Sequence, residues 1–184
     1  ITKYLLSKIL AVPSDLKQEL HSESFYFKTF EYLLMNDNLS FISVWSPTFF
    51  LELNQFLVTH KEELISSLKS KYSSENSRLI YLEKVMYAYH SWKDLWPNLA
   101  VISCWCDAQS SLWVAQVQAI IGNVYIQGKG LLSTEGICSV PILKGKSPVL
   151  CVQSHFYEFR TLHNGKVLLA HELNLNEIYE PIIT

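Results

Sequence analysis

The segment that decides the fold lies at residues 100–127 and reads AVISCWCDAQSSLWVAQVQAIIGNVYIQ. Its two ends, residues 100–105 and 124–127, are short apolar runs with the β-branched and aromatic residues that are typical of buried strands. Between them, Asp107 can cap a helix whose apolar residues recur at helical spacing and whose pattern stops at Gly122-Asn123. Strand, helix and strand in this order predict two parallel strands joined by a right-handed crossover.

Upstream of this segment the apolar spacing is mostly helical. Residues 25–34 and 79–89 carry apolar side chains at the intervals of amphipathic helices. Ser46-Pro47 is a good helix start, with an N-cap hydroxyl followed by proline at the first helical position, and the helix it opens has a plausible break near His60. A further strand-like run occupies residues 39–45. This part of the chain is therefore predicted to pack helices around a small sheet.

The chain changes character near Gly122, because all six glycines lie at or beyond that position. From Gly136 onward the pattern predicts only short strands, with Asn164-Gly165 as a hairpin turn, at residues 137–142, 149–152, 155–160, 167–170 and 179–184. We therefore expect an α/β fold: a parallel-sheet subdomain with many helices at residues 1–145, followed by a segment rich in β-strands at residues 146–184.

Composition narrows the class of protein. The 184 residues are 49% hydrophobic and 17% charged, which is enough apolar surface for a large core. Fifteen basic and seventeen acidic residues give a net charge of -2, so no strong positive field exists to hold a nucleic acid. No apolar run approaches the roughly 18 residues of a membrane span. The four cysteines form no disulfide framework, and we expect a cytoplasmic protein without a nucleic-acid or membrane partner.

The densest group of glycines and polar residues lies at residues 128–136 and reads GKGLLSTEG. It directly follows a predicted parallel strand, and ligands of open α/β sheets bind just beyond the carboxyl ends of such strands. Ser133 and Thr134 can bond phosphate oxygens, and Glu135 can hold a hard cation such as Mg²⁺. The group suits a metal-bound nucleotide. The alternative is a glycine-rich turn whose hydroxyls bond their own backbone and whose acid is merely exposed.

Two other chemistries lack their motif in this region. A Walker phosphate loop is excluded, because Gly122 and Gly128 are one residue too far apart and Gly130, not a hydroxyl residue, follows Lys129. A nucleophile elbow is also missing, because Ser133 lies three residues from the nearest glycine on either side. Serine hydrolase chemistry therefore has no support.

The cysteines and tryptophans are mostly structural in this interpretation. No C-x-x-C pair is present, so we take the cysteines as small buried apolar residues, with thiol chemistry at Cys104 or Cys106 as a weak third possibility. Trp105 ends a predicted strand at the ligand-facing edge and can line a pocket. The other tryptophans are expected in the core or in contacts between helices, and they are Trp45, Trp92, Trp96 and Trp113.

Three blocks of the sequence resemble one known family. They are LSFISVWSPTF at residues 39–49, LWPNLAVISCW at residues 95–105 and VYIQGKGLLSTEG at residues 124–136. They closely resemble bacterial members of the auxin-responsive acyl-acid amido synthetase family, which belongs to the adenylate-forming superfamily. The resemblance covers most of the chain and is strongest from about residue 39 to residue 143.

The resemblance implies an activity. Members of this family are ligases that use ATP and Mg²⁺ to activate a carboxylic acid as an acyl-adenylate, and they then pass the acyl group to the amine of an amino acid. It implies that residues 1–145 are an adenylate-forming α/β subdomain carrying the middle nucleotide motif, and that residues 146–184 are the start of a β-rich subdomain, incomplete at its C-terminal end. The substrates expected for this protein are therefore a small carboxylic acid and an amino acid.

The resemblance also assigns roles to single residues. Ser133-Thr134-Glu135 matches the middle nucleotide motif, which implies that Thr134 contacts phosphate, that Glu135 helps to hold Mg²⁺, and that these two residues are catalytic. Ser133, Thr134, Gly130 and Leu131 would then bind the nucleotide. Trp105, Cys106 and Asp107 match a loop near the adenine and acyl pocket, and Leu132 would join them at the substrate. Leu131-Leu132 replaces the aromatic and small residues of many superfamily members, so aliphatic packing replaces ring stacking.

Finally, the resemblance implies that this chain is a central fragment. The upstream phosphate loop, the strand pair that ends in a ribose-binding Asp and the mobile C-terminal domain of the superfamily are all missing from the 184 residues. We therefore expect the isolated segment to be inactive and to work with the remainder of the same polypeptide. The alternative is a non-catalytic α/β module that binds a small molecule.

Overall fold

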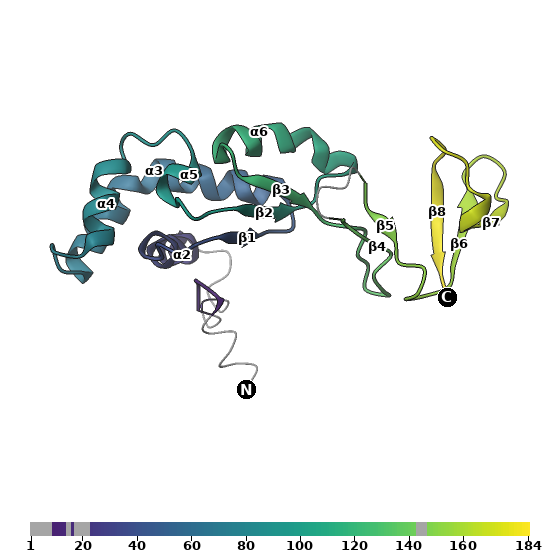
Figure 1. The fold of residues 1–184 in the computed structure, drawn as a ribbon, viewed down its shortest axis with the longest axis horizontal. Coiled ribbons are helices and arrows are strands. Elements are labelled where there is room, and N and C mark those ends of the chain that lie inside the picture. The colour runs from purple at the N-terminus through teal and green to yellow at the C-terminus, as the bar shows by residue number, and fades with distance from the viewer. Residues whose placement is uncertain (1–8, 14–15, 17–22, 143–146) are drawn as a thin grey trace. The chain divides into compact units, whose positions relative to one another are not determined.

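The computed structural model describes residues 9–13, 16, 23–142 and 147–184. The chain divides into two compact units, Ile1–Gln127 and Gly128–Thr184, and each is described by itself (Figure 1). The glycine-rich group at residues 128–136 therefore belongs to the same unit as the β-rich segment. The predicted domains at residues 1–145 and 146–184 concern the intact protein and stay a prediction.

A three-stranded parallel sheet with the order β1-β2-β3 lies in the first unit, and its strands are Phe41–Ser43, Val101–Cys104 and Tyr125–Gly128. β1 pairs with β2 in parallel, with Phe41 opposite Val101 and Ser43 opposite Ser103. Figure 1 shows the three arrows pointing in the same direction. The structure thus confirms the parallel arrangement predicted from residues 100–127, as well as the additional strand predicted upstream.

The helices of this unit are α2 (Glu23–Met35), α3 (Pro47–Lys71), α4 (Ser77–Val85), α5 (Trp92–Leu95) and α6 (Ser111–Ile121). α6 connects β2 to β3 along the chain and lies above the strands in Figure 1. Among the described residues, no helix combines the length and the apolar character that a bilayer crossing requires.

The long helix α3 begins and bends where the sequence predicts. The Ser46 hydroxyl accepts a hydrogen bond from the Thr48 amide at 3.1 Å, and Pro47 occupies the first helical position. His60 departs from helical geometry, with φ −107° and ψ 17°. The predicted break near His60 is therefore confirmed as a kink within one continuous helix.

The start of α6 differs from the prediction, but its end does not. Asp107 occupies the N-cap position of a short 3₁₀ turn, Ala108–Ser110, but its side chain makes no capping hydrogen bond. Ala108 adopts a positive φ of 50°, which turns the chain before the α-helix begins at Ser111. Gly122 ends the helix with a φ of 69°, a conformation that favours glycine.

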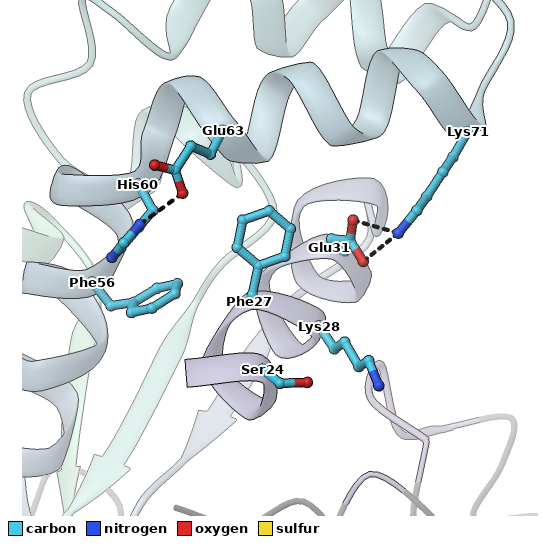
Figure 2. A pocket seen from close by; sticks show the side chains of 8 residues that line it. All are labelled: Ser24, Phe27, Lys28, Glu31, Phe56, His60, Glu63 and Lys71. Carbon is cyan, nitrogen blue, oxygen red and sulfur yellow. Dashed lines mark hydrogen bonds and ion pairs between the residues drawn. The ribbon is translucent and has the colours of Figure 1, made fainter. Parts of the chain in front are cut away.

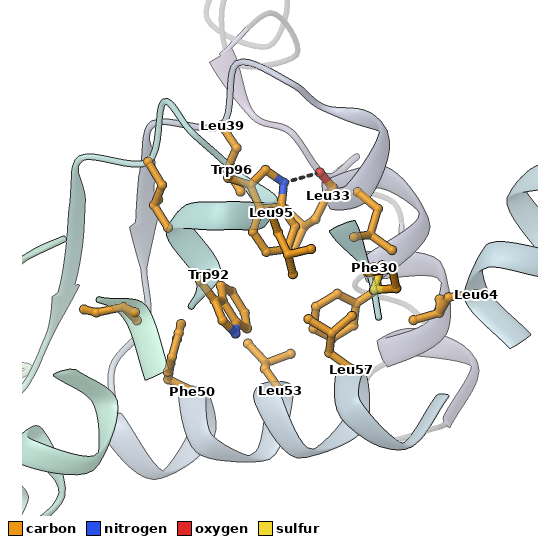
Figure 3. Packing of buried hydrophobic residues seen from close by; sticks show 14 of the residues in the cluster. Phe30, Leu33, Leu39, Phe50, Leu53, Leu57, Leu64, Trp92, Leu95 and Trp96 are labelled. Atoms are coloured by element: carbon orange, nitrogen blue, oxygen red, sulfur yellow. Dashed lines mark hydrogen bonds between the residues drawn. The ribbon is translucent and has the colours of Figure 1, made fainter. Parts of the chain in front are cut away.

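The hydrophobic core of the first unit is formed by buried residues of α2, α3, α4, α5, α6 and β2, and Figure 3 shows the part between α2, α3 and α5. Trp92 is fully buried, its ring centroid lies 4.4 Å from that of Phe50, and its indole nitrogen donates to Asn54. Trp96 is also fully buried and donates to the Leu33 carbonyl at 2.8 Å. Both buried indole N–H groups therefore have the partners that burial requires.

The core prediction was wrong for two other tryptophans. Trp45 is 57% exposed and Trp113 is 40% exposed. Trp45 comes directly after the buried Val44 at the end of β1, and Trp113 lies on α6 next to the exposed Leu112. Large aromatic residues alone do not reveal which face of an element is buried, because this depends on what packs against it.

The strands that the structure describes in the second unit are short and antiparallel, and the unit also contains a short 3₁₀ helix at Ala170–Glu172. β4 (Ser139–Val140) pairs with β5 (Val149–Leu150), and a separate sheet has the order β7-β6-β8, with strands Val167–Leu169, Tyr157–Thr161 and Tyr179–Ile183. The Gly165 amide donates to the Thr161 carbonyl at 3.0 Å with φ 70° at Gly165, which confirms the predicted hairpin turn. The strand predicted at residues 137–142 is shorter than expected.

Candidate functional site

The glycine-rich group folds back on itself directly after β3. Leu132 forms an isolated antiparallel bridge with Ile137. The Leu131 carbonyl accepts hydrogen bonds from the amides of Cys138 and Ser139, at 3.0 and 3.2 Å, and the Leu131 amide donates to the Ser139 hydroxyl at 2.9 Å. The chain therefore forms a narrow hairpin with its tip near residues 133–136.

Gly130 allows the two arms of this hairpin to approach closely. A Cβ atom at Gly130 would overlap the backbone carbonyl of Ser139, which belongs to β4 and cannot move aside as a flexible side chain could. Only glycine fits this position. Gly130 is thus required by the hairpin itself, whether or not a nucleotide lies beside it.

Ser133 closes the tip of the hairpin. Its amide and its hydroxyl both donate to the Gly136 carbonyl, at 3.0 and 3.1 Å, and the same hydroxyl oxygen lies 3.2 Å from the Gly136 amide. These are the bonds that a turn supported by its own hydroxyl makes. At Ser133 the geometry is the one expected of the glycine-rich turn, and the predicted role of Ser133 in nucleotide binding stays a prediction.

Thr134 and Glu135 are exposed at the tip. The pKa of Glu135 lies below its ordinary value because the carboxylate accepts hydrogen bonds, first from its own backbone amide and then from the Thr134 hydroxyl, with the polar Ser133 side chain close by. The acid is therefore ionised at neutral pH, and its charge stands next to two hydroxyl groups.

This donor set fits a cation that is shared with phosphate. Mg²⁺ usually keeps several waters and binds one or two carboxylates together with substrate phosphates. Glu135 supplies one exposed, ionised carboxylate of that kind. In the part of the chain that is described, no three His, Cys, Asp or Glu side chains gather into a possible metal site. The predicted role of Glu135 in holding Mg²⁺ stays a prediction.

Leu131 and Leu132 lie beside this tip and present apolar surface. Leu131 is 53% exposed and Leu132 is 37% exposed. Their side chains are available to an apolar part of a ligand, such as a purine ring or the body of an acid. Their assignment to the nucleotide and to the substrate, respectively, stays a prediction.

The other predicted residues follow β2 in the first unit. Trp105 is partly exposed and donates its amide to the Trp45 carbonyl at 2.9 Å. The two indole rings lie 5.4 Å apart at 51° to each other. Cys106 is half-buried, and its thiol donates to the Cys104 carbonyl at 3.4 Å. Asp107 is exposed.

Trp45 is the residue that sequence reasoning missed. Ser43 and Ser103 are paired in the parallel ladder, and Trp45 and Trp105 each follow two residues later. Because side chains of paired parallel strands emerge at the same edge, equal offsets place the two indoles together. The two offsets can be compared only once the register of the ladder is known, so no local pattern in the sequence reveals this pair. The structure thus brings Trp45 to Trp105 within the first unit and gathers Leu131 to Gly136 within the second.

Comparison with known proteins identifies the family. The sequence model of the GH3 family N-terminal domain matches residues 2–126, which is more than half of the chain. The chain belongs to the GH3 family. A comparison with curated protein sequences gives no match.

Two solved structures share the fold of this GH3 chain. One is a "GH3.15 acyl acid amido synthetase" with a TM-score of 0.71 at 18% identity, over 88% of this chain and 34% of its own. The other is an "AtGH3.15 acyl acid amido synthetase in complex with 2,4-DB" with a TM-score of 0.69 at 19% identity, over 88% of this chain and 33% of its own. The GH3 chain therefore spans about a third of the length of these structures.

A pocket of about 330 Å³ lies between α2 and α3 of the GH3 chain (Figure 2). Two pairs of its lining residues contact each other: the Lys71 ammonium lies 2.6 and 2.7 Å from the two Glu31 carboxylate oxygens, and the His60 Nδ1 lies 3.0 Å from Glu63. The His60 ring also stacks on Phe56, with 4.3 Å between ring centroids. These contacts join α2 to α3 and support the kink at His60.

A second cavity of about 420 Å³ is lined mainly by apolar residues of α2, of β1 and of residues 9–12. The Thr29 hydroxyl is buried there and has no hydrogen-bond partner among the residues that are described. Neither cavity is lined by a residue that the sequence predicts for nucleotide or substrate binding.

Proposed function

We propose that the intact protein is an ATP-dependent ligase that adenylates a carboxylic acid and joins it to an amino acid through an amide bond. The observation that carries this proposal is membership of the GH3 family through residues 2–126. The two solved structures with the same fold are named as acyl acid amido synthetases. The 184 residues would supply part of the active site, and we expect them to be inactive when isolated.

The chemistry of the first step explains why the tip of the hairpin is suited to it. A substrate carboxylate that attacks the α-phosphate of ATP brings one anion to another, so a cation and hydrogen-bond donors must offset the charge. In this proposal Glu135 holds Mg²⁺, which would supply that positive charge when bound, and the Thr134 hydroxyl donates to a phosphate oxygen. Ser133 and Gly130 shape the backbone around the nucleotide, and Leu131 packs against it.

The exposed indoles at the carboxyl end of the sheet are suited to the organic part of the substrates. Trp45 and Trp105 offer two aromatic surfaces side by side, and such surfaces bind planar apolar groups. We propose that these rings, with Cys106 and Asp107, contact the acid or the adenine, and that Leu132 contacts the acid. One of the two solved structures is a complex with 2,4-DB, which supports a small organic molecule as substrate.

The four cysteines support a cytoplasmic location as part of this proposal. No disulfide bond joins Cys104, Cys106, Cys138 and Cys151. Free thiols of this kind are typical of a reducing compartment.

ATP–pyrophosphate exchange by the intact protein tests the proposed function. With a panel of small carboxylic acids, we expect isotope exchange that requires both Mg²⁺ and one of the acids, and we expect an amide product when an amino acid is added. Binding of an acid and of ATP without any exchange would contradict the ligase and would identify a non-catalytic small-molecule-binding module instead.

A further inference from the structure

The hairpin tip that carries Thr134 and Glu135 is anchored from one side by a neighbouring segment of the same unit. Ser133, Thr134 and Glu135 are all exposed, and the tip closes through the hydrogen bonds between Ser133 and Gly136. Exposed turns of this kind open easily. A charge-stabilising site must instead be held in place before the reaction begins. Contacts that hold the tip are therefore of functional interest.

The first anchor is on the carbonyl of Ile137, the residue that follows Gly136. The Tyr157 hydroxyl donates to this carbonyl at 2.8 Å, and the Ser154 hydroxyl lies 3.1 Å from it. The two hydroxyls are 2.8 Å from each other. Tyr157 is only 6% exposed, so its hydroxyl approaches Ile137 from within the packed part of the unit.

Ser154 is itself fixed by its neighbours. Its amide and its hydroxyl both reach the Cys151 carbonyl, each at 2.9 Å, and the Cys151 amide donates to the Cys138 carbonyl at 2.8 Å. The segment that carries Ser154 and Tyr157 is thus tied to the arm of the hairpin that follows the tip. Buried and part-buried hydroxyl networks of this kind reinforce one another.

The second anchor is a ring contact on Gly136. A Cβ atom at this position would collide with the His155 ring and would lie only 2.9 Å from both of its nitrogens. The φ angle of Gly136 is not positive, so the backbone conformation itself does not exclude alanine, and the three atoms nearest to the added Cβ all belong to the His155 imidazole. His155 is held in turn by Ser154, whose hydroxyl lies 3.1 Å from the ring Nδ1.

We propose that Ser154, His155 and Tyr157 are positioning residues that hold the Ser133–Gly136 tip, and so set where Thr134 and Glu135 meet the phosphates and Mg²⁺. Their role in catalysis rests on the proposed function, whereas their hold on the tip does not. None of them was predicted from the sequence, because they lie about twenty residues away along the chain.

A pair of compensating substitutions tests the ring contact in the intact protein. Gly136→Ala places a methyl group against the imidazole, and we expect the dissociation constant of Mg·ATP to rise by roughly 5- to 100-fold. Amide hydrogen exchange of residues 131–137 should become faster. Adding His155→Ala removes the ring, and the double variant should recover most of the lost affinity and protection. A double variant no better than Gly136→Ala would overturn the ring contact.

Tyr157→Phe tests the hydroxyl anchor and keeps the aromatic packing. We expect faster exchange of residues 131–137 and a rise of about 2- to 10-fold in both the Mg·ATP dissociation constant and the Mg²⁺ concentration for half-maximal exchange activity. KM for the acid should change little. Tyr179→Phe is the matched control, because its hydroxyl bonds Glu177 and Asn174 rather than the tip. Equal effects of both variants would overturn the assignment.

The two readouts separate this inference from the proposed function. Hydrogen exchange reports on the tip whatever the protein catalyses. If Tyr157→Phe loosens the tip and Glu135→Gln has no effect on Mg·ATP binding, the positioning role stands and the ligase role of Glu135 fails. If Glu135→Gln abolishes Mg·ATP binding while Tyr157→Phe and Gly136→Ala change nothing, the positioning role fails alone.

Discussion

Glu135 is the residue on which the proposed chemistry depends most directly. Its carboxylate is ionised and exposed at the hairpin tip, so it can meet a nucleotide-bound cation with little need to shed solvent. The Thr134 hydroxyl lies beside it and donates to it, so a phosphate would compete for that proton, whereas the Ser133 hydroxyl already donates to the Gly136 carbonyl. Glu135 therefore keeps its negative charge, whereas its hydrogen-bond partners can change when a ligand binds.

Glu135→Gln in the intact protein removes the charge and keeps the shape of the side chain. If the carboxylate holds Mg²⁺ at the phosphates, acyl-adenylate formation should fall by about 10²- to 10³-fold, which is typical for the loss of one preorganised charge-stabilising group. Pyrophosphate release measures this step. Glu52→Gln, an exposed acid on α3, is the control and should leave the rate unchanged. An unchanged rate in Glu135→Gln would exclude the proposed role.

The positions of Trp45 and Trp105 relative to each other depend on the strands that precede them. Each lies two positions beyond one of a pair of aligned serines, Ser43 and Ser103. Trp105 could be selected from its place after a predicted strand. Trp45 could not, because its partner lies sixty residues away and the register between the strands is set by pairing rather than by local pattern.

Short helices in this protein depend on side chains that form hydrogen bonds with the backbone at the helix ends. α5 has only four residues, and Asp94 within it accepts hydrogen bonds from the amides of His90 at 2.8 Å and Ser91 at 2.9 Å. These bonds, first the one from His90, hold the pKa of Asp94 below its ordinary value of 3.8. A carboxylate with a lowered pKa stabilises the fold above that value and stops doing so as the pH falls through the folded-state pKa.

Asp94→Ala should therefore destabilise the first unit by about 0.5–1 kcal/mol at neutral pH, in the range of an exposed cap. The difference from the unchanged protein should persist down to the ordinary pKa of the acid and shrink below it. Urea unfolding at a series of pH values measures this. Asp107→Ala is the matched control, because the Asp107 side chain makes no capping bond. A loss that is independent of pH would contradict the charge-based explanation.

At the scale of the whole molecule, the core of the first unit brings together helices that the sequence predicts one at a time. α3 contributes Phe50, Leu53, Leu57 and Leu64 along one face, and these meet α2 and α5 (Figure 3). Leu57 is fully buried, whereas the next residue, Val58, is 45% exposed. One step along the helix thus separates the core from solvent.

Leu57→Ala should lower the free energy of unfolding by about 2–5 kcal/mol, because it removes buried apolar contacts and leaves a cavity. Val58→Ala should cost less than about 0.5 kcal/mol. Tryptophan fluorescence during chemical denaturation reports on this directly, since Trp92 and Trp96 lie in the same core. A similar loss in both variants would contradict the burial that the structure assigns to this face of α3.

Features that depend on a few neighbouring residues could be predicted from the sequence. The helix start at Ser46-Pro47, the helix end at Gly122, the turn at Asn164-Gly165 and the parallel strands around α6 are of this kind. Each follows from a backbone conformation or a periodicity that is encoded within one or two turns of the chain. The family was likewise readable from contiguous blocks of sequence.

Contacts between distant segments emerged only once the chain was folded. The approach of Gly130 to Ser139, the ring of His155 on Gly136 and the pairing of Trp45 with Trp105 join residues that no local pattern connects. The same limit explains why Trp45 and Trp113 were expected in the core and lie partly exposed. Burial and neighbour identity are set by which surfaces pack together, and packing is a property of the folded whole.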